Sequence, residues 1–326
     1  MIIIIKNADM GKILCIGEAL IDMICTDKGK PLSQGEHFLK KAGGAPANVA
    51  AAIAALGGRV DMTAKVGIDP FGQHLVDTLM EMKVGTGHVF RDKDHFTTFA
   101  FVSLMENGER DFYFNRGADA QLSIIDLANI DLSAYGIVHF GSATAFLPGP
   151  LQQAYLHMLS EAKRHGHFIS FDPNYRELLF GHNKPSFITQ SWQFLNHCDL
   201  FKVSDDEAML LTGSDSVASA AGIFLKETNA VFAITLGAKG TLLGYNGRTI
   251  HIESIPITPV DTTGAGDAFV GALLFQLQQA GAVGAFGQPG EDWERMMTNA
   301  NKAGARTCMY LGAMEAFRHL SDQIFD

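Results

Sequence analysis

The sequence has few of the features that mark secreted or membrane proteins. Its 326 residues include four cysteines without CxxC spacing, Cys15, Cys25, Cys198 and Cys308. Scattered cysteines of this kind indicate reduced thiols in a cytoplasmic protein. No segment contains the roughly 18 uncharged apolar residues of a membrane span. Residues 1–10 lack a signal-peptide pattern and are expected to be an extension without function.

Positive charge is also scarce. The chain has 25 Lys and Arg against 35 Asp and Glu, which gives a formal net charge of −10. This balance argues against nucleic acid or an anionic membrane as a partner. A phosphate site in such a chain must be a local positive region, built from backbone dipoles more than from bulk charge.

Several common functional motifs are missing. No GxGxxG follows the first apolar run, which argues against a dinucleotide-dependent oxidoreductase. The phosphate-binding pattern GxxxxGK[ST] is absent, so any phosphate site is not of the P-loop type. The 12 histidines form no HExxH pattern, and no transition-metal site is expected.

Short apolar runs alternate with helix-prone segments after residue 136. This rhythm predicts strands at residues 137–140, 168–171, 200–203 and 231–236, with helices at 151–165 and 205–211 between them. Alternating strands and helices indicate an α/β fold with a mainly parallel central sheet flanked by helices on both faces. An earlier strand at 13–16 and an alanine-rich helix at 45–56 are also predicted.

Two β-rich runs near residue 100 do not fit this rhythm. Residues 97–105 and 110–116 are joined by a turn containing Asn107-Gly108, which is a strong hairpin signal. A weak alternation at residues 36–40 precedes them. We interpret these pieces as a small antiparallel accessory sheet. The chain shows no internal repeat and no low-complexity linker.

The segment Asp261-Thr262-Thr263-Gly264-Ala265-Gly266-Asp267 carries most of the functional information. It precedes an apolar run at 268–277 that is typical of a buried helix, so it lies at a helix N-terminus, where anions bind. Asp267 beside such an anion hole would suit a base that takes a proton from an attacking hydroxyl. The alternative is structural: Thr263 caps the helix, and Asp267 interacts favourably with its dipole.

Polar clusters occur at the ends of three predicted strands, at residues 172–176, 202–207 and 235–240, and a fourth follows Val260 at residues 261–267. Ligands bind beyond the carboxyl ends of the strands in open α/β sheets. We therefore expect the clusters to line a shared cleft. The planar guanidinium of Arg176 suits a phosphate or sugar oxygen, and a carboxylate after an apolar run, Asp22, must find hydroxyl or backbone donors.

These motifs resemble the PfkB (ribokinase-like) family of sugar kinases, whose carboxyl-terminal signature is DTxGAGD. The family's glycine signature is matched by Gly43-Gly44-Ala45-Pro46-Ala47-Asn48. With Val49-Ala50 following, this segment is most similar to fructokinases. The resemblance implies a single kinase domain over residues 11–320. It also implies a β lid, and often a dimer surface, formed here by segments near 18–41 and 90–118.

The resemblance also assigns roles to individual residues. Asp267 is the general base, with Gly264, Ala265 and Gly266 forming the anion hole. The sugar-side residues are Asp22, Gly43, Gly44, Asn48 and Arg176. The residues assigned to nucleotide and Mg²⁺ are Lys202, Ser204, Glu207, Thr235, Gly237, Gly240 and Asn301. Asp261, Thr263 and Gly312 are assigned to a monovalent cation, K⁺. Ser204 departs from the family pattern Asn-x-x-Glu.

The predicted activity is the ATP-dependent phosphorylation of a small sugar at a primary hydroxyl, with fructose converted to fructose 6-phosphate. The alternatives are a kinase for 2-keto-3-deoxygluconate or another sugar, and a non-catalytic sugar-binding relative. Loss of the base would favour the last of these, but Asp267 is present. The expected ligands are the sugar, ATP, Mg²⁺ and K⁺, and the expected assembly is a homodimer through the lid.

Overall fold

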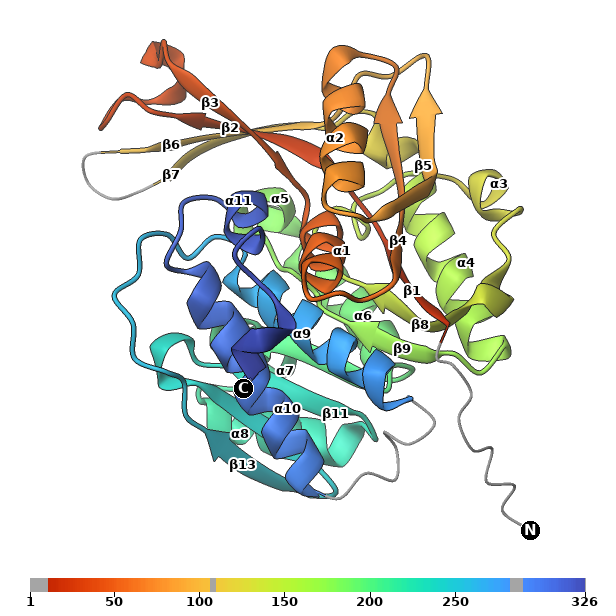
Figure 1. The fold of residues 1–326 in the computed structure, drawn as a ribbon, viewed down its shortest axis with the longest axis vertical. Helices are drawn as coiled ribbons and strands as arrows, with labels where there is room; N and C mark the ends of the chain where they lie inside the picture. The colour runs from red at the N-terminus through yellow and green to blue at the C-terminus, as the bar shows by residue number, and fades with distance from the viewer. Residues whose placement is uncertain (1–10, 106–109, 282–289, 326) are drawn as a thin grey trace.

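A computed structural model describes residues 11–105, 110–281 and 290–325. The predicted extension at 1–10 and the Asn107-Gly108 turn lie outside these residues. Within them the strands form two sheets, one of nine strands and one of four (Figure 1). The predicted α/β architecture, with helices on both faces of a mainly parallel sheet and a smaller accessory sheet, is confirmed.

The large sheet has the order β13-β12-β11-β10-β9-β8-β1-β4-β5. Its strands are β1 (Lys12–Ile16), β4 (Val60–Gly67), β5 (Gly85–Asp92), β8 (Tyr135–Phe140), β9 (Phe168–Phe171), β10 (Leu200–Ser204), β11 (Val231–Thr235), β12 (Thr241–Tyr245) and β13 (Arg248–Ile252). All neighbours pair in parallel except at one edge, where β12 is antiparallel to both β11 and β13. The strands predicted from apolar runs are β1, β8, β9, β10 and β11, which lie in the interior of the sheet.

The helices are α1 (Ala45–Ala55), α2 (Pro70–Glu81), α3 (Ile124–Leu127), α4 (Pro150–Arg164), α5 (Glu177–Phe180), α6 (Lys184–Leu195), α7 (Asp205–Thr212), α8 (Val217–Glu227), α9 (Ala265–Ala280), α10 (Gly290–Thr307) and α11 (Ala313–Phe317). The helices cover the two faces of the large sheet, and each face has its own hydrophobic core. One core joins α1, α2, α9, α10 and α11 to the sheet, and the other joins α4, α6, α7 and α8.

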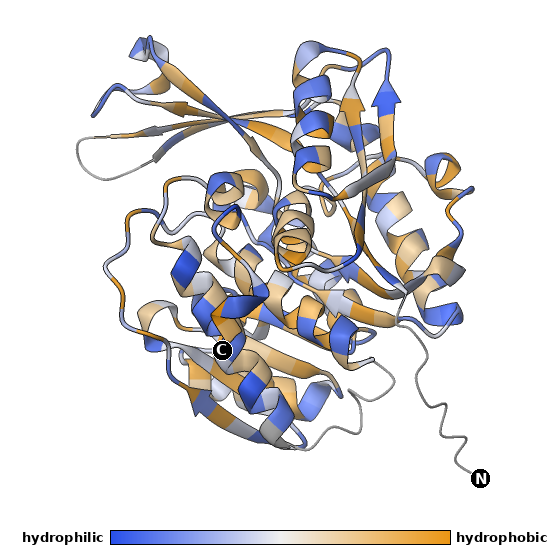
Figure 2. Cartoon of the chain, viewed as in Figure 1, coloured by the Kyte–Doolittle hydropathy of each residue, from blue (hydrophilic) through white to orange (hydrophobic). Residues whose placement is uncertain are grey.

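Strand β1 shows how the sequence builds these two cores. Ile13 and Cys15 point into the core that contains α1 and α9, whereas Leu14 and Ile16 point into the core that contains α4. A strand covered by helices on both faces is therefore apolar along nearly its whole length. Figure 2 shows the corresponding pattern, with hydrophobic central strands and more hydrophilic outer helices such as α2 and α10.

The small sheet has the order β3-β2-β6-β7 and projects from one end of the large sheet (Figure 1). Its strands are β2 (Leu20–Cys25), β3 (Phe38–Gly43), β6 (Phe99–Leu104) and β7 (Arg110–Asn115). The predicted hairpin is present as the antiparallel pair of β6 and β7. The pair of β2 and β6 is parallel, so the sheet is antiparallel at two of its three junctions.

The described helices include no single one with the length and apolarity to cross a bilayer. The bent pair of α7 and α8 meets these criteria only when its members are counted together. The four cysteines have free thiols: Cys15, Cys198 and Cys308 are buried, and Cys25 is half-buried.

Candidate active site

The predicted anion-hole loop forms the beginning of helix α9. Gly264 is the N-cap residue, with φ of +81°, and no side chain caps the helix. A Cβ on Gly264 would lie 2.5 Å from the Cβ of Ala313, so both the backbone angle and the space require glycine. The Ala265 N–H donates to the Thr262 carbonyl at 3.2 Å. The N–H groups of Gly266 and Asp267 are thus at the positive end of the helix without a side-chain acceptor.

Asp267 extends from the first turn of α9 toward the N-terminal turn of α1. Its Oδ2 accepts a hydrogen bond from Asn48 Nδ2 at 2.8 Å. Burial raises the pKa of Asp267, while the bond from Asn48 and the charges of Lys202 and Arg176 oppose this effect. The other polar atom of Asn48, Oδ1, is buried and has no partner among the described residues. The carboxylate of Asp267 thus lies beside a hydrogen-bond acceptor, Asn48 Oδ1, that has no partner among the described residues.

Asp22 lies on β2, close enough to Asp267 for the two charges to interact. Burial raises the pKa of Asp22 to about 7; Arg176 opposes this shift, and Glu18 and Asp267 add to it. A Cβ on Gly43 would lie 2.1 Å from Asp22 Oδ2, so the strand beside Asp22 has no room for a side chain. A site with two interacting carboxylates favours a ligand that donates hydrogen bonds.

Lys202 provides a buried positive charge next to the anion hole. It lies on β10, and its Nζ is 3.2 Å from Asp172 Oδ2. A Cβ on Gly266 would lie 3.1 Å from the same Nζ, which places the ammonium against the loop. Burial acts to lower the pKa of Lys202, but the carboxylates of Asp172, Glu207 and Asp267 raise it overall. Lys202 therefore stays charged, as a phosphate-binding lysine must be.

Ser204 and Glu207 form a capping box at the start of α7. Ser204 Oγ accepts from the Glu207 N–H at 3.1 Å, and Glu207 Oε2 accepts from the Ser204 N–H at 2.8 Å. Glu207 Oε1 accepts from the Tyr175 N–H at 2.7 Å. Both carboxylate oxygens of Glu207 are therefore engaged by backbone groups, and any contact with a metal ion must be shared with them or pass through water.

Arg176 is exposed at the start of α5. Its guanidinium donates to the Tyr175 carbonyl at 3.1 Å and to Asn174 Oδ1 at 3.3 Å. Its charge lowers the pKa of both Asp22 and Asp267, in opposition to burial. Arg176 is thus an exposed cation close to both carboxylates.

The predicted nucleotide-side residues lie on the strands next to Lys202. Thr235 ends β11, and its Oγ1 donates to the Val203 carbonyl at 3.3 Å. Gly237 and Gly240 form the following turn with φ of +58° and +92°. Asn301, on α10, accepts from Thr241 and donates to two backbone carbonyls of the edge hairpin. The amide of Asn301 therefore joins α10 to the edge hairpin of β12 and β13.

Asp261 ties the loop before α9 to the loop before α11. Its Oδ1 accepts from the N–H and the Oγ1 of Thr263, at 3.0 and 2.7 Å, and its Oδ2 accepts from the Gly312 N–H at 2.8 Å. Thr263 thus bonds back to Asp261. The alternative in which Thr263 caps α9 is wrong, because Gly264 occupies the N-cap position.

The described residues contain no group of three or more His, Cys, Asp or Glu side chains that could hold a metal ion on its own. Around Lys202, however, three carboxylates face one ammonium. A divalent ion that enters with a nucleotide and keeps phosphate and water ligands fits this surplus of negative charge.

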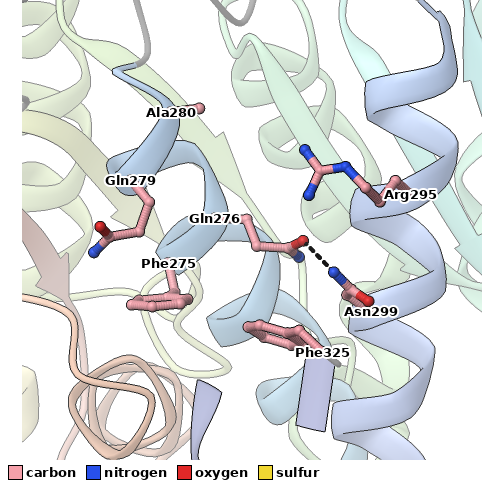
Figure 3. A pocket seen from close by; sticks show the side chains of 7 residues that line it. All are labelled: Phe275, Gln276, Gln279, Ala280, Arg295, Asn299 and Phe325. Atoms are coloured by element: carbon pink, nitrogen blue, oxygen red, sulfur yellow. Dashed lines mark hydrogen bonds between the residues drawn. The ribbon is translucent and has the colours of Figure 1, made fainter. Parts of the chain in front are cut away.

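A separate hollow of about 480 Å³ lies at the other end of α9 (Figure 3). It is lined by Phe275, Gln276, Gln279, Ala280, Arg295, Asn299 and Phe325. Phe275 is about ten residues along the helix from Ala265, which corresponds to roughly 15 Å. This hollow is therefore not part of the cleft around Asp267.

The structure brings together five of the residues singled out in the sequence: Asp22, Asn48, Arg176, Lys202 and Asp267. Asp172 was noted as part of a polar cluster, but its pairing with Lys202 was not predicted. No role is predicted from the sequence for Glu18, which is buried two residues before β2. Its burial beside Asp22 could have been suspected only from its place directly after an apolar run.

Comparisons with known proteins agree with this geometry. The family model described as pfkB family carbohydrate kinase matches residues 10–319 of the chain. The chain is 37% identical over 308 residues to Fructokinase-1 of Oryza sativa subsp. japonica, with 93% of each chain covered.

Two solved structures share the fold along almost the whole chain. A fructokinase double mutant from Vibrio cholerae O395, with fructose, ADP and potassium ion bound, has a TM-score of 0.83 at 29% identity and 98% coverage of both chains. A fructokinase from Xylella fastidiosa with bound ATP has a TM-score of 0.83 at 30% identity and 96% coverage of both chains. This chain therefore belongs to the pfkB family of carbohydrate kinases and is an ATP-dependent sugar kinase.

Proposed function

We propose that the chain transfers the γ-phosphoryl group of ATP to the primary hydroxyl of fructose, forming fructose 6-phosphate. The pairing of Asp267 with Asn48 carries this proposal, because it places a base and a buried acceptor without a partner beside the helix N-terminus. The fructokinases of similar sequence and fold support it.

Asp267 accepts the proton of the attacking hydroxyl as the new oxygen–phosphorus bond forms and the bond from the γ-phosphorus to the bridging oxygen of ADP, the leaving group, breaks. Asn48 Oδ1 and the Asp22 carboxylate accept hydroxyl hydrogens and hold the sugar in line with the phosphate. The N–H groups of Gly266 and Asp267, with the ammonium of Lys202, stabilise negative charge on the phosphoryl oxygens. Gly264 sets the backbone geometry, and Ala265 contributes the turn rather than a free N–H.

The charges of the cleft favour a neutral sugar over an acidic one. Glu18 and Asp267 both lie close enough to raise the pKa of Asp22, and Arg176 is the cation that lowers it. Asp267 also interacts with Arg176 and with Lys202 on its phosphate side. A carboxylate on the substrate would add another negative charge. This observation favours fructose over 2-keto-3-deoxygluconate.

On the nucleotide side, we assign Lys202 to the phosphates and Thr235, Gly237 and Gly240 to the backbone cradle. Ser204 acts as a helix cap, and Asn301 holds the edge hairpin to α10. Glu207 would help to hold Mg²⁺ through water, because its oxygens already accept from backbone groups. Mg²⁺ entering with ATP would offset charge on the β- and γ-oxygens. Asp261, Thr263 and Gly312 would order a K⁺ site through the loops that they join.

We further propose that residues 11–320 act as one kinase domain in the cytoplasm and that the small sheet is its lid. Here and below, the lid sheet means strands β2, β3, β6 and β7. It carries Asp22 and approaches the body of the protein through the ion pair of Lys41 and Glu315, at 2.5 Å. Closure over the sugar would exclude water from the transferred phosphoryl group.

A panel of sugars tests the substrate assignment. ATP consumption and sugar phosphate formation are measured with fructose, glucose, ribose, adenosine and 2-keto-3-deoxygluconate under identical conditions. We expect kcat/KM for fructose to exceed that for every other acceptor by at least about tenfold, as the loss of a paired hydroxyl or an added charge would produce. A preference for the keto acid, or phosphorylation of no sugar, would contradict the proposal.

A further inference from the structure

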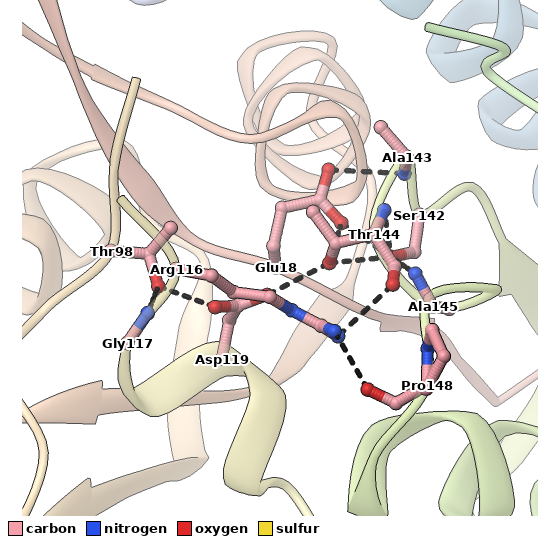
Figure 4. A network of polar contacts seen from close by, with 10 residues as sticks. All are labelled: Glu18, Thr98, Arg116, Gly117, Asp119, Ser142, Ala143, Thr144, Ala145 and Pro148. Atoms are coloured by element: carbon pink, nitrogen blue, oxygen red, sulfur yellow. Dashed lines mark hydrogen bonds and ion pairs between the residues drawn. The ribbon is translucent and has the colours of Figure 1, made fainter. Parts of the chain in front are cut away.

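All four strands of the lid sheet begin or end at one buried polar network (Figure 4). Strand β2 starts two residues after Glu18, and β3 ends beside Ala45, whose N–H donates to Glu18 Oε1 at 3.2 Å. Strand β6 starts one residue after Thr98, and β7 ends one residue before Arg116. The network therefore lies where the lid sheet joins the rest of the molecule.

Asp119 is the centre of the network on the side of β6 and β7. Its side chain is fully buried. Its Oδ1 accepts a hydrogen bond from Thr98 Oγ1, and the same Thr98 oxygen accepts from the Gly117 N–H at 2.8 Å. Its Oδ2 lies 3.4 Å from Arg116 Nε. One carboxylate thus holds the start of β6 and the end of β7 together.

Thr144 connects Asp119 to Glu18, the second buried carboxylate of the network. Thr144 Oγ1 donates to Asp119 Oδ2 at 2.9 Å and lies 3.4 Å from Glu18 Oε2. Glu18 Oε2 also accepts from Ser142 Oγ, and Glu18 Oε1 accepts from the Ala143 N–H at 3.2 Å. Ser142, Ala143 and Thr144 follow β8. The segment before β2 is therefore hydrogen-bonded to the loop at the carboxyl end of a strand of the large sheet.

Arg116 links Asp119 to two backbone carbonyls at the more exposed side of the network. Its Nη1 donates to the Pro148 carbonyl and its Nη2 to the Thr144 carbonyl, each at 3.1 Å. Its guanidinium therefore spans Asp119 and the segment that leads into α4. Polar groups with charged partners in a buried setting are costly to leave unpaired, so the members hold one another in a single arrangement.

We propose that Asp119 is a positioning residue for phosphoryl transfer: by holding Thr98, Arg116 and Thr144 together, it fixes the angle at which the lid sheet stands over the cleft. Asp22 is on β2 of the same sheet, so this angle sets the position of a sugar-binding carboxylate relative to Asp267. The inference rests on the proposed role of the small sheet as the lid of a sugar kinase.

The experiment breaks the network at Thr98 with little change in volume. Thr98→Val removes the hydroxyl that bonds Asp119 and the Gly117 N–H. We expect the ratio of sugar-independent ATP hydrolysis to fructose phosphorylation to rise roughly tenfold, with a higher KM for fructose, because a loosened lid admits water. Thr98→Ser keeps the hydroxyl and should stay within about twofold of the wild type.

Thr63→Val is the matched control. Thr63 is a fully buried threonine on β4 whose Oγ1 has no partner among the described residues, so the same substitution breaks no bond. It should leave the hydrolysis ratio unchanged. A merely structural role of Thr98 would lower the melting temperature without changing this ratio.

Hydrogen exchange provides a readout that does not depend on activity. Thr98→Val should accelerate exchange in β2, β3, β6 and β7 while leaving β1, β8 and β9 unchanged. If the wild type phosphorylates no sugar, the proposed function fails, but this exchange pattern still tests the anchoring of the lid sheet. Equal hydrolysis ratios in all variants, or faster exchange spread over both sheets, would overturn the inference.

Discussion

At the scale of single residues, the cleft holds carboxylates in positions that favour substrate binding over stability. Asp22 and Asp267 both have raised pKa values, with burial as the main cause. A carboxylate that is costly to ionise in the folded protein lowers stability at neutral pH. In the proposed function, the hydroxyls of the sugar would supply hydrogen-bond donors to these carboxylates and so offset this cost.

Replacing Asp22 should therefore stabilise the protein in a pH-dependent way. The folded-state pKa of Asp22 is about 7, against about 3.9 in an unfolded chain. Its favourable contribution is fully present below the unfolded value and is lost as pH rises through 7. Asp22→Asn should raise the free energy of unfolding by roughly 1–3 kcal/mol more at pH 8 than at pH 5.

Denaturant titrations of both proteins at the two pH values measure this difference. The same variant should bind fructose more weakly, because it has lost a charged acceptor. An equal gain at both pH values, or a loss of stability at pH 8, would show that folding does not raise the pKa of Asp22.

At the scale of helices, strands and loops, Ser204 shows how a family position can change its role. As the N-cap of α7 it bonds Glu207 in both directions. Ser204→Ala should cost about 1 kcal/mol of stability, the usual value of a lost cap. The KM for ATP should change by less than about threefold, since less than 1 kcal/mol of binding is at stake. Thermal unfolding and ATP saturation curves test both, and a large rise in KM with unchanged stability would make Ser204 a nucleotide ligand.

The loops joined by Asp261 give a prediction about ions. If these loops order a monovalent cation next to α9, replacing K⁺ by tetramethylammonium at constant ionic strength should lower activity through a higher KM for ATP. The physical reason is that the ion would fix the loop that carries the anion-hole N–H groups. Steady-state rates in K⁺, Na⁺ and tetramethylammonium provide the test, and equal rates in all three salts would remove the cation from the mechanism.

The interior elements were predictable from sequence because they are mostly apolar or strongly helix-prone. Strand β4 was missed because polar Asp61, Thr63 and Lys65 interrupt its apolar pattern, although Thr63 is buried. The hairpin of β12 and β13 carried a usable signal in Asn246-Gly247, where both residues have positive φ. Two motifs placed Asn48 and Asp267 in the same site, although the hydrogen bond between them was not predicted. Asp119 gave no local signal, because Thr98 and Thr144 are distant from it in sequence.

At the scale of the whole molecule, one face of the lid sheet is apolar and partly uncovered. Strand register places Ile24, Leu39 and Val102 side by side, with Leu104 two residues further along β6. Leu104 is 60% exposed. Asp22 is on the same face of β2, so we propose that the end of this face away from Asp22 forms a homodimer interface. An exposed apolar sheet surface is a common site of self-association.

Sedimentation velocity tests this assembly. The wild type should sediment with the mass of two chains at micromolar concentration, and Leu104→Glu should shift it toward one chain, because a charge buried without a partner opposes association. Ile125→Glu is a control at an aliphatic residue outside the lid sheet that is even more exposed than Leu104, and it should leave the dimer intact. A wild type that sediments as a single chain would contradict the interface.

The central claim is that Asp267 is the general base, and turnover of Asp267→Asn tests it most directly. The substitution keeps the size of the side chain and removes the proton acceptor. Asp199→Asn is the matched control, because Asp199 also has a pKa raised by burial and accepts one hydrogen bond, from the Ile169 N–H at 2.7 Å, but lies before β10 at the opposite edge of the sheet. We expect Asp267→Asn to lower kcat by roughly 10²–10⁴-fold, with fructose and ATP binding little changed. Near-normal turnover of Asp267→Asn, with a stability change of about 1 kcal/mol or less, would instead make Asp267 a residue that only interacts favourably with the helix dipole.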